Sequence, residues 1–160
     1  SVTTLPPVDL LIACGFGWTL LALALIDLRH HLLPDAITLP LTAAGLALAW
    51  LRPGDLLLDR ALGSVLGFSI FYFISMAYRY VRKRDGLGMG DAKLLAAGGA
   101  WVAWQGLPSV VVLAGTAALV VVGLQIARGR RVDAKTRIPF GLYLCPAIWL
   151  IWLIGPLKFG

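Results

Sequence analysis

The sequence predicts an all-α, polytopic integral membrane protein with about six transmembrane helices. Of its 160 residues, 59% are hydrophobic and only 14% are charged, whereas an ordinary soluble domain is about 45–50% apolar and about 25% charged. The mean hydropathy is +0.86. The fourteen Lys and Arg residues fall in short clusters between long apolar runs, which is typical of helical membrane proteins. A water-soluble globule and an intrinsically disordered chain are therefore excluded.

The first two predicted helices cover residues 8–28 and 36–51. A helix needs roughly 20 apolar residues to cross a ~30 Å hydrocarbon core. The first segment meets this length, and residues 19–26 form an unbroken run within it. Because no basic segment precedes it, we do not expect a cleavable signal peptide. The second segment is shorter and contains Pro40, which predicts a bend.

The remaining predicted helices cover residues 61–80, 92–104, 109–127 and 138–157. The third is followed by a basic run, residues 80–85, which is typical of a cytoplasmic boundary and of a contact with anionic lipid. The fourth is short and contains paired glycines, so we expect a bend or a close helix contact there. The connections between all six are too short to be domains, and we expect a single transmembrane domain over residues 1–160.

The basic residues predict the orientation of this domain. Eleven of the fourteen Lys and Arg residues lie on the first, third and fifth connections and their edges, and three lie on the other side. Since cytoplasmic loops retain positive charge, both termini are expected on the non-cytoplasmic side. This bias also explains the net charge of +6 without a nucleic-acid partner.

Two aspartates are the candidate catalytic residues. Asp27 follows the apolar run of the first helix, and Asp91 lies where a glycine-rich stretch enters the fourth helix. An aspartate within a spanning helix costs roughly 2.5–3.5 kcal/mol, so it usually has a function. Both lie near the cytoplasmic ends of their helices and can form a pair. The alternatives are a helix cap at Asp91 and an interfacial ion pair between Asp27 and Arg29.

A pair of carboxylates suits the hydrolysis of a peptide bond. Two close acids do not both ionise easily, so one activates water as a base while the other keeps a proton and donates it to the scissile carbonyl. Gly88 and Gly90 allow an extended substrate to approach the backbone closely. We expect Asp91, at a helix N-terminus, to be ionised and Asp27, at a helix C-terminus, to hold the proton.

Three blocks of sequence resemble the bacterial type IV prepilin peptidases. The first is Asp-Leu-Arg-His-His-Leu-Leu-Pro-Asp at residues 27–35, the second Gly-Leu-Gly-Met-Gly-Asp-Ala-Lys-Leu at residues 86–94, and the third Arg-Ile-Pro-Phe-Gly at residues 137–141. The second contains the Gly-x-Gly-Asp signature of the family. In the third, Leu142 stands where a final proline is expected.

The resemblance implies an aspartic endopeptidase of the bacterial cytoplasmic (inner) membrane. It would remove the basic leader from the prepilins of type IV pili or the pseudopilins of type II secretion, with Asp27 and Asp91 as the catalytic pair and without a metal or cofactor. Such a substrate has an apolar helix after its leader. The Cys-x-x-Cys segment of full-length relatives is absent from these residues, so we do not expect N-methyltransferase activity, and the chain resembles the peptidase core as a short member or a fragment.

Further residues have weaker assignments. For Asp35 we favour a role at the start of the second helix over substrate binding, and for Lys93 a contact with lipid phosphate over an effect on the charge of Asp91. Cys14 and Cys145 each lie alone in an apolar run and are predicted to be packing residues, with no metal site.

Two functions of another class stay open. A non-catalytic relative that acts in pilus or secretion assembly would have the same topology. A small ion-coupled transporter would also carry carboxylates in a helical bundle, but near the bilayer midplane rather than at one face. Among enzymes, the presenilin-like peptidases share Gly-x-Gly-Asp but have a Pro-Ala-Leu element that this sequence lacks.

Overall fold

A computed structural model describes residues 7–31, 33–52, 54, 57–82, 89–129 and 139–155. Within these ranges every regular element is an α-helix, which confirms that the fold is all-α. The helices are α1 (Pro7–His30), α2 (Asp35–Leu51), α3 (Leu57–Arg82), α4 (Met89–Ala127) and α5 (Phe140–Ile154).

Three of these helices are long and apolar enough to cross a membrane. They are α1 over Val8–His30, α3 over Leu57–Val81, and α4 over Met89–Ala127 when it is taken as one helix across its kink. The apolar helices α2 and α5 are shorter, with 17 and 15 residues. These helices suit a membrane protein, whereas the number of spans and the side on which each terminus lies stay predictions.

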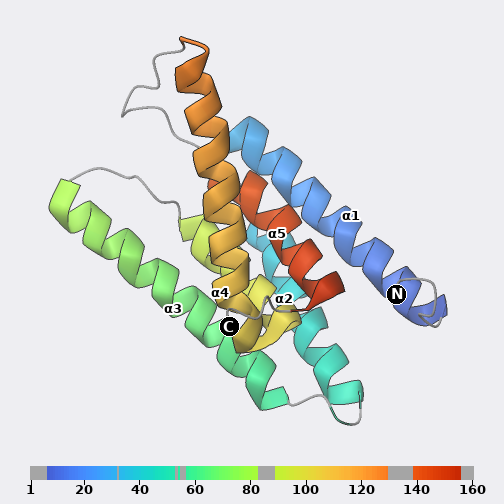
Figure 1. Ribbon diagram of the computed structural model, residues 1–160. Coiled ribbons are helices and arrows are strands. Elements are labelled where there is room, and N and C mark those ends of the chain that lie inside the picture. Colours follow the sequence, from blue (N-terminus) through green and yellow to red (C-terminus); the bar gives the residue numbers. More distant parts are fainter. Residues whose placement is uncertain are drawn as a thin grey trace.

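The fourth and fifth predicted helices follow each other within α4. We expected a connection over residues 105–108, but these residues are helical and the interruption lies at Ala103, whose φ of 59° and ψ of 176° are not helical. Figure 1 shows the chain reversing its direction there, because the yellow-green part of α4 runs down to the kink and the orange part runs back up. The helix boundary was therefore predicted a few residues too late.

Glycines allow α3 and α4 to pack backbone against backbone. A Cβ atom added to Gly99 would lie 2.2 Å from the carbonyl oxygen of Gly63, and one added to Gly67 would lie 2.6 Å from that of Leu95. Small residues of this kind permit close approach in membrane helices, where apolar burial does not drive association. The close helix contact predicted from the paired glycines of the fourth segment is thereby confirmed at Gly99.

An aromatic cluster joins α4 to α1 and α2. The indole Nε1 of Trp101 donates a hydrogen bond of 2.8 Å to the carbonyl oxygen of Leu41 in α2. On its other side, the Trp101 ring stacks on Phe16 of α1, with 3.9 Å between ring centroids and 11° between planes. The part of α4 before the kink at Ala103, which we call its first arm, is therefore fixed against both neighbouring helices; the part after the kink is its second arm.

The two candidate aspartates lie at the same end of the bundle. Figure 1 shows that the C-terminal ends of α1 and α3 and the N-terminal ends of α2, α4 and α5 lie at one end, whereas the kink of α4 lies at the other. Asp27 is in the last turns of α1 and Asp91 in the first turn of α4, so the fold brings both to this end.

Candidate active site

Asp27 is buried between the end of α1 and the beginning of α5. Only 5% of the residue is exposed. A Cβ atom added to Gly141, in the first turn of α5, would lie 2.7 Å from its Oδ2 atom, and the backbone N–H groups of Gly141 and Leu142 face the carboxylate. Within the described residues Oδ2 has no hydrogen-bond partner of good geometry. One carboxylate oxygen is therefore left for a water molecule or a substrate.

The beginning of α5 changes the electrostatic argument for Asp27. We expected the C-terminal end of α1 to disfavour a negative charge there. The N-terminal end of α5, which is the positive end of its helix dipole, favours a negative charge at the same place. The two helix ends oppose each other, so the expectation that Asp27 holds the shared proton stays a prediction with a smaller driving force.

Asp91 lies in the first turn of α4 and is also buried. The residue is 8% exposed, and three of the positions that follow it, Ala92, Leu94 and Leu95, are buried in the core. The apolar stripe of α4 therefore holds the aspartate inside the bundle, at a helix end where the backbone N–H groups stabilise a carboxylate.

A buried thiol lies near both carboxylates. Cys145 of α5 is 1% exposed, and both Asp27 and Asp91 act on it electrostatically. Because electrostatic effects weaken with distance, both carboxylates lie in the neighbourhood of this thiol. Their catalytic roles stay a prediction, and Cys145 is a packing residue, as expected.

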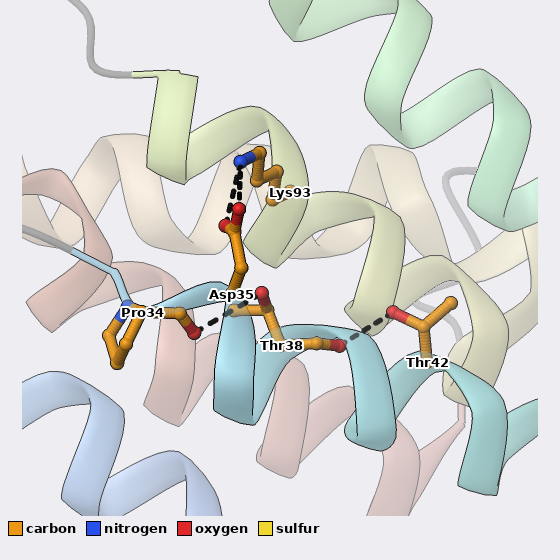
Figure 2. Close-up of polar contacts among 5 residues, drawn as sticks. All are labelled: Pro34, Asp35, Thr38, Thr42 and Lys93. Atoms are coloured by element: carbon orange, nitrogen blue, oxygen red, sulfur yellow. Dashed lines mark hydrogen bonds and ion pairs between the residues drawn. The ribbon is translucent and has the colours of Figure 1, made fainter.

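Asp35 and Lys93 form an ion pair that we did not predict. Figure 2 shows the Lys93 ammonium between both carboxylate oxygens of Asp35, at 2.6 and 2.7 Å. Asp35 does begin α2, as expected, but its carboxylate does not cap the helix, whose N-cap residue is Pro34. Lys93 binds Asp35, and its contact with lipid phosphate stays a prediction. The pair ties the first turn of α2 to the first turn of α4, which carries Asp91.

No local pattern in the sequence predicts this ion pair. The two residues are 58 positions apart, and the only signal in the sequence was that each lies near the start of a predicted helix at the same end of the bundle. The side chains are 35% and 53% exposed, so the pair lies at the rim of the site and not in its interior.

The two glycines of the signature have different outcomes. Gly90 lies at the start of α4, where an added Cβ atom would lie 3.0 Å from the Cβ atom of Leu33; the glycine lets α4 approach the segment that joins α1 to α2. Gly88 lies outside the described residues. Close approach of a substrate to either glycine stays a prediction.

The chain is similar to known leader peptidases. Residues 14–123 match the type IV leader peptidase family. The prepilin leader peptidase/N-methyltransferase of Aeromonas hydrophila is 38% identical over 156 residues, which are 97% of this chain and 53% of that protein. Its counterpart in Pseudomonas aeruginosa is 38% identical over 138 residues, 86% of this chain and 47% of that protein.

A shorter relative is covered more fully. Leader peptidase HopD of Escherichia coli is 42% identical over 127 residues, which are 78% of this chain and 81% of HopD. The chain thus spans about half the length of the prepilin leader peptidase/N-methyltransferases that it matches, but most of HopD. No solved structure matches the chain.

Proposed function

The chain belongs to the type IV leader peptidase family, and we propose that it is an aspartic endopeptidase that removes the basic leader from type IV prepilins or type II secretion pseudopilins. The observation that carries this proposal is the burial of Asp27 and Asp91 around one region of the interior, beside Cys145. Two carboxylates in one poorly solvated place share a proton, which is the state that general acid–base hydrolysis needs.

The proposed reaction divides the work between the two aspartates. Asp91, at the start of α4, takes a proton from the attacking water, whose oxygen bonds to the scissile carbonyl carbon. Asp27 donates its proton to the carbonyl oxygen, and a tetrahedral diol forms. Asp91 then gives a proton to the leaving nitrogen, the C–N bond breaks, and Asp27 recovers its proton from the diol. The chain needs no metal or cofactor for these steps.

The ion pair between Asp35 and Lys93 is a positioning element in this proposal. It joins α2 to the turn of α4 that carries Asp91, two residues before Lys93. A tether at this point limits the movement of Asp91 relative to the rest of the bundle. Precise placement matters because a misplacement of about 1 Å can reduce a rate by about 10²-fold.

Cleavage of a prepilin by the purified protein tests the function. In detergent or in proteoliposomes, we expect the wild type to remove the leader, and Asp27→Asn and Asp91→Asn each to abolish cleavage. Asp59→Asn is a matched control, because Asp59 accepts hydrogen bonds from Trp104 and Gln105 in another part of the bundle. Retained activity in either site variant would remove that residue from catalysis. Failure of the wild type on prepilins and pseudopilins alike would refute the function.

The proposed location is the bacterial inner membrane, with the site at the cytoplasmic face and both termini outside the cytoplasm. This follows from the excess of basic residues on one set of connections, since cytoplasmic loops retain positive charge. Alkaline phosphatase fused to the C-terminus should be active in cells, and green fluorescent protein fused at the same place should stay dark. The opposite result would reverse the orientation.

A further inference from the structure

An apolar groove of about 440 Å³ lies between α1 and α5. Its α1 side extends from Ala13 to Ala24, and its α5 side from Leu142 to Trp149. Side chains along its edge are open to the outside: Trp18 is 71% exposed and Leu21 is 49% exposed. An exposed apolar surface of this kind on a membrane protein faces either lipid or another apolar helix.

The groove leads to the candidate catalytic pair. Ala24 precedes Asp27 by three residues, so the two lie on neighbouring turns of one side of α1. Leu142 lines the groove and its backbone N–H faces the Asp27 carboxylate. Cys145 also lines the groove, and it is the residue on which both carboxylates act. A chain bound along the groove therefore has one end at the carboxylates.

The length and the lining of the groove define its occupant. From Ala13 to Ala24 the axis of α1 rises about 16 Å, which matches about three turns of a second helix. The lining offers almost no polar partners to an extended backbone, and in a bilayer an unpaired backbone group is strongly destabilising. An occupant of this length must therefore satisfy its own backbone, as an α-helix does.

We infer that the groove between α1 and α5 holds the apolar helical segment of the substrate next to the scissile bond. This inference rests on the proposed function. The segment lies along α1 and places side chains at helical spacing, i, i+3, i+4 and i+7, against the groove. The scissile bond then lies at the N-terminal end of this helix, beside Asp27 and Asp91. Substrate selection thus depends on residues of α1 and α5 far from the carboxylates.

Filling the groove tests the inference. Cys14 lines the groove and is exposed, so Cys14→Trp narrows the groove from its open side. Ala22→Trp is the matched control, because Ala22 is an exposed α1 residue that does not line the groove. Two substrates are compared: a full prepilin, and a short soluble peptide with the leader and scissile bond but no apolar segment.

The readout is the ratio of kcat/KM for the prepilin to kcat/KM for the short peptide. We expect Cys14→Trp to lower this ratio about tenfold, mainly by raising KM for the prepilin, and Ala22→Trp to keep the wild-type ratio. An unchanged ratio in a folded Cys14→Trp variant would overturn the groove assignment and leave the peptidase function intact. A wild type that cleaves neither substrate would refute the function itself.

Alkylation of the native Cys14 thiol provides a second test in which no residue of the groove is replaced. In proteoliposomes of Asp27→Asn, which should bind the prepilin without cleaving it, an excess of prepilin should slow the reaction of Cys14 with N-ethylmaleimide about tenfold. Cys145 is buried, and Cys14→Ser measures its residual labelling. Equal rates with and without prepilin would show that lipid alone occupies the groove, and would overturn the inference.

Discussion

Replacing Gly99 by alanine should push α4 away from α3 and displace Asp91. The new Cβ atom would lie 2.2 Å from the carbonyl oxygen of Gly63, whereas ordinary contact begins at 3.4 Å. Because the obstructing atom belongs to the backbone, no side chain can turn aside, and the helices must separate by about 1.2 Å, the difference between the two distances. Overpacking of this kind costs about 1–3 kcal/mol.

The expected effects follow from this displacement. For a chain of this size, each kcal/mol lowers the melting temperature by about 2–4 °C, so we expect a loss of about 2–12 °C. Asp91 lies on the same arm of α4 as Gly99, eight residues away. A shift of about 1 Å at the carboxylate should therefore reduce kcat by as much as about 10²-fold.

Thermal unfolding in detergent and cleavage of a prepilin are the two assays. Gly115→Ala is the control, because it makes the same change on the second arm of α4, where nothing lies within 4 Å of an added Cβ atom. The intrinsic helix propensity changes equally in both variants, and their difference isolates the contact. Equal melting temperatures and equal rates in the two variants would refute the argument.

Three further substitutions test other contacts. In a double-mutant cycle on unfolding, Asp35→Ala and Lys93→Ala should couple by about 0.2–1 kcal/mol, because the pair is partly exposed; strict additivity would mean that it contributes nothing. Ala103→Gly should raise the melting temperature, because a conformation suited to glycine costs other residues roughly 1–3 kcal/mol, and a lower value would contradict this strain. Trp101→Phe should cost about 0.5–1.5 kcal/mol in unfolding free energy through the lost hydrogen bond to Leu41, whereas unchanged stability would show that this bond is not needed.

The positions of the two aspartates could be predicted because the free-energy cost of a carboxylate in an apolar helix depends on the sequence around it. An acid at the end of an apolar run is expensive wherever the helix packs, and the basic connections indicate which helix ends lie together. The structure buries Asp27 and Asp91 at one end of the bundle in agreement with this. Their burial was therefore predictable, and their catalytic roles await the cleavage assay.

The partners of these residues were not predictable, because they come from distant segments. The N–H groups that face Asp27 belong to Gly141 and Leu142, more than a hundred residues along the chain, and only the packing of α5 on α1 brings them there. Likewise, the contact of Lys93 with Asp35 depends on how α2 meets α4. A single sequence carries hydrophobic patterns for each helix but not the register between helices.

The kink of α4 has a similar explanation. The connection was expected over residues 105–108, which include Gly106 and Pro108, two residue types that disfavour helices. The actual break is at Ala103, an alanine with positive φ, a residue type that does not favour such a conformation. The close contact between Gly63 and the backbone of Ala103 and Trp104 shows that packing against α3 accompanies the break.

The shortness of α5 has a consequence for how water reaches the site. A helix of 15 residues is about 22 Å long, well below the ~30 Å thickness of a hydrocarbon core, whereas the 24 residues of α1 extend over about 36 Å. Bilayers respond to such hydrophobic mismatch by thinning locally. We therefore expect the leaflet on the Asp27 side to be depressed over the beginning of α5, so that bulk water meets Asp27 at the bilayer surface and the site needs no aqueous channel through the bundle.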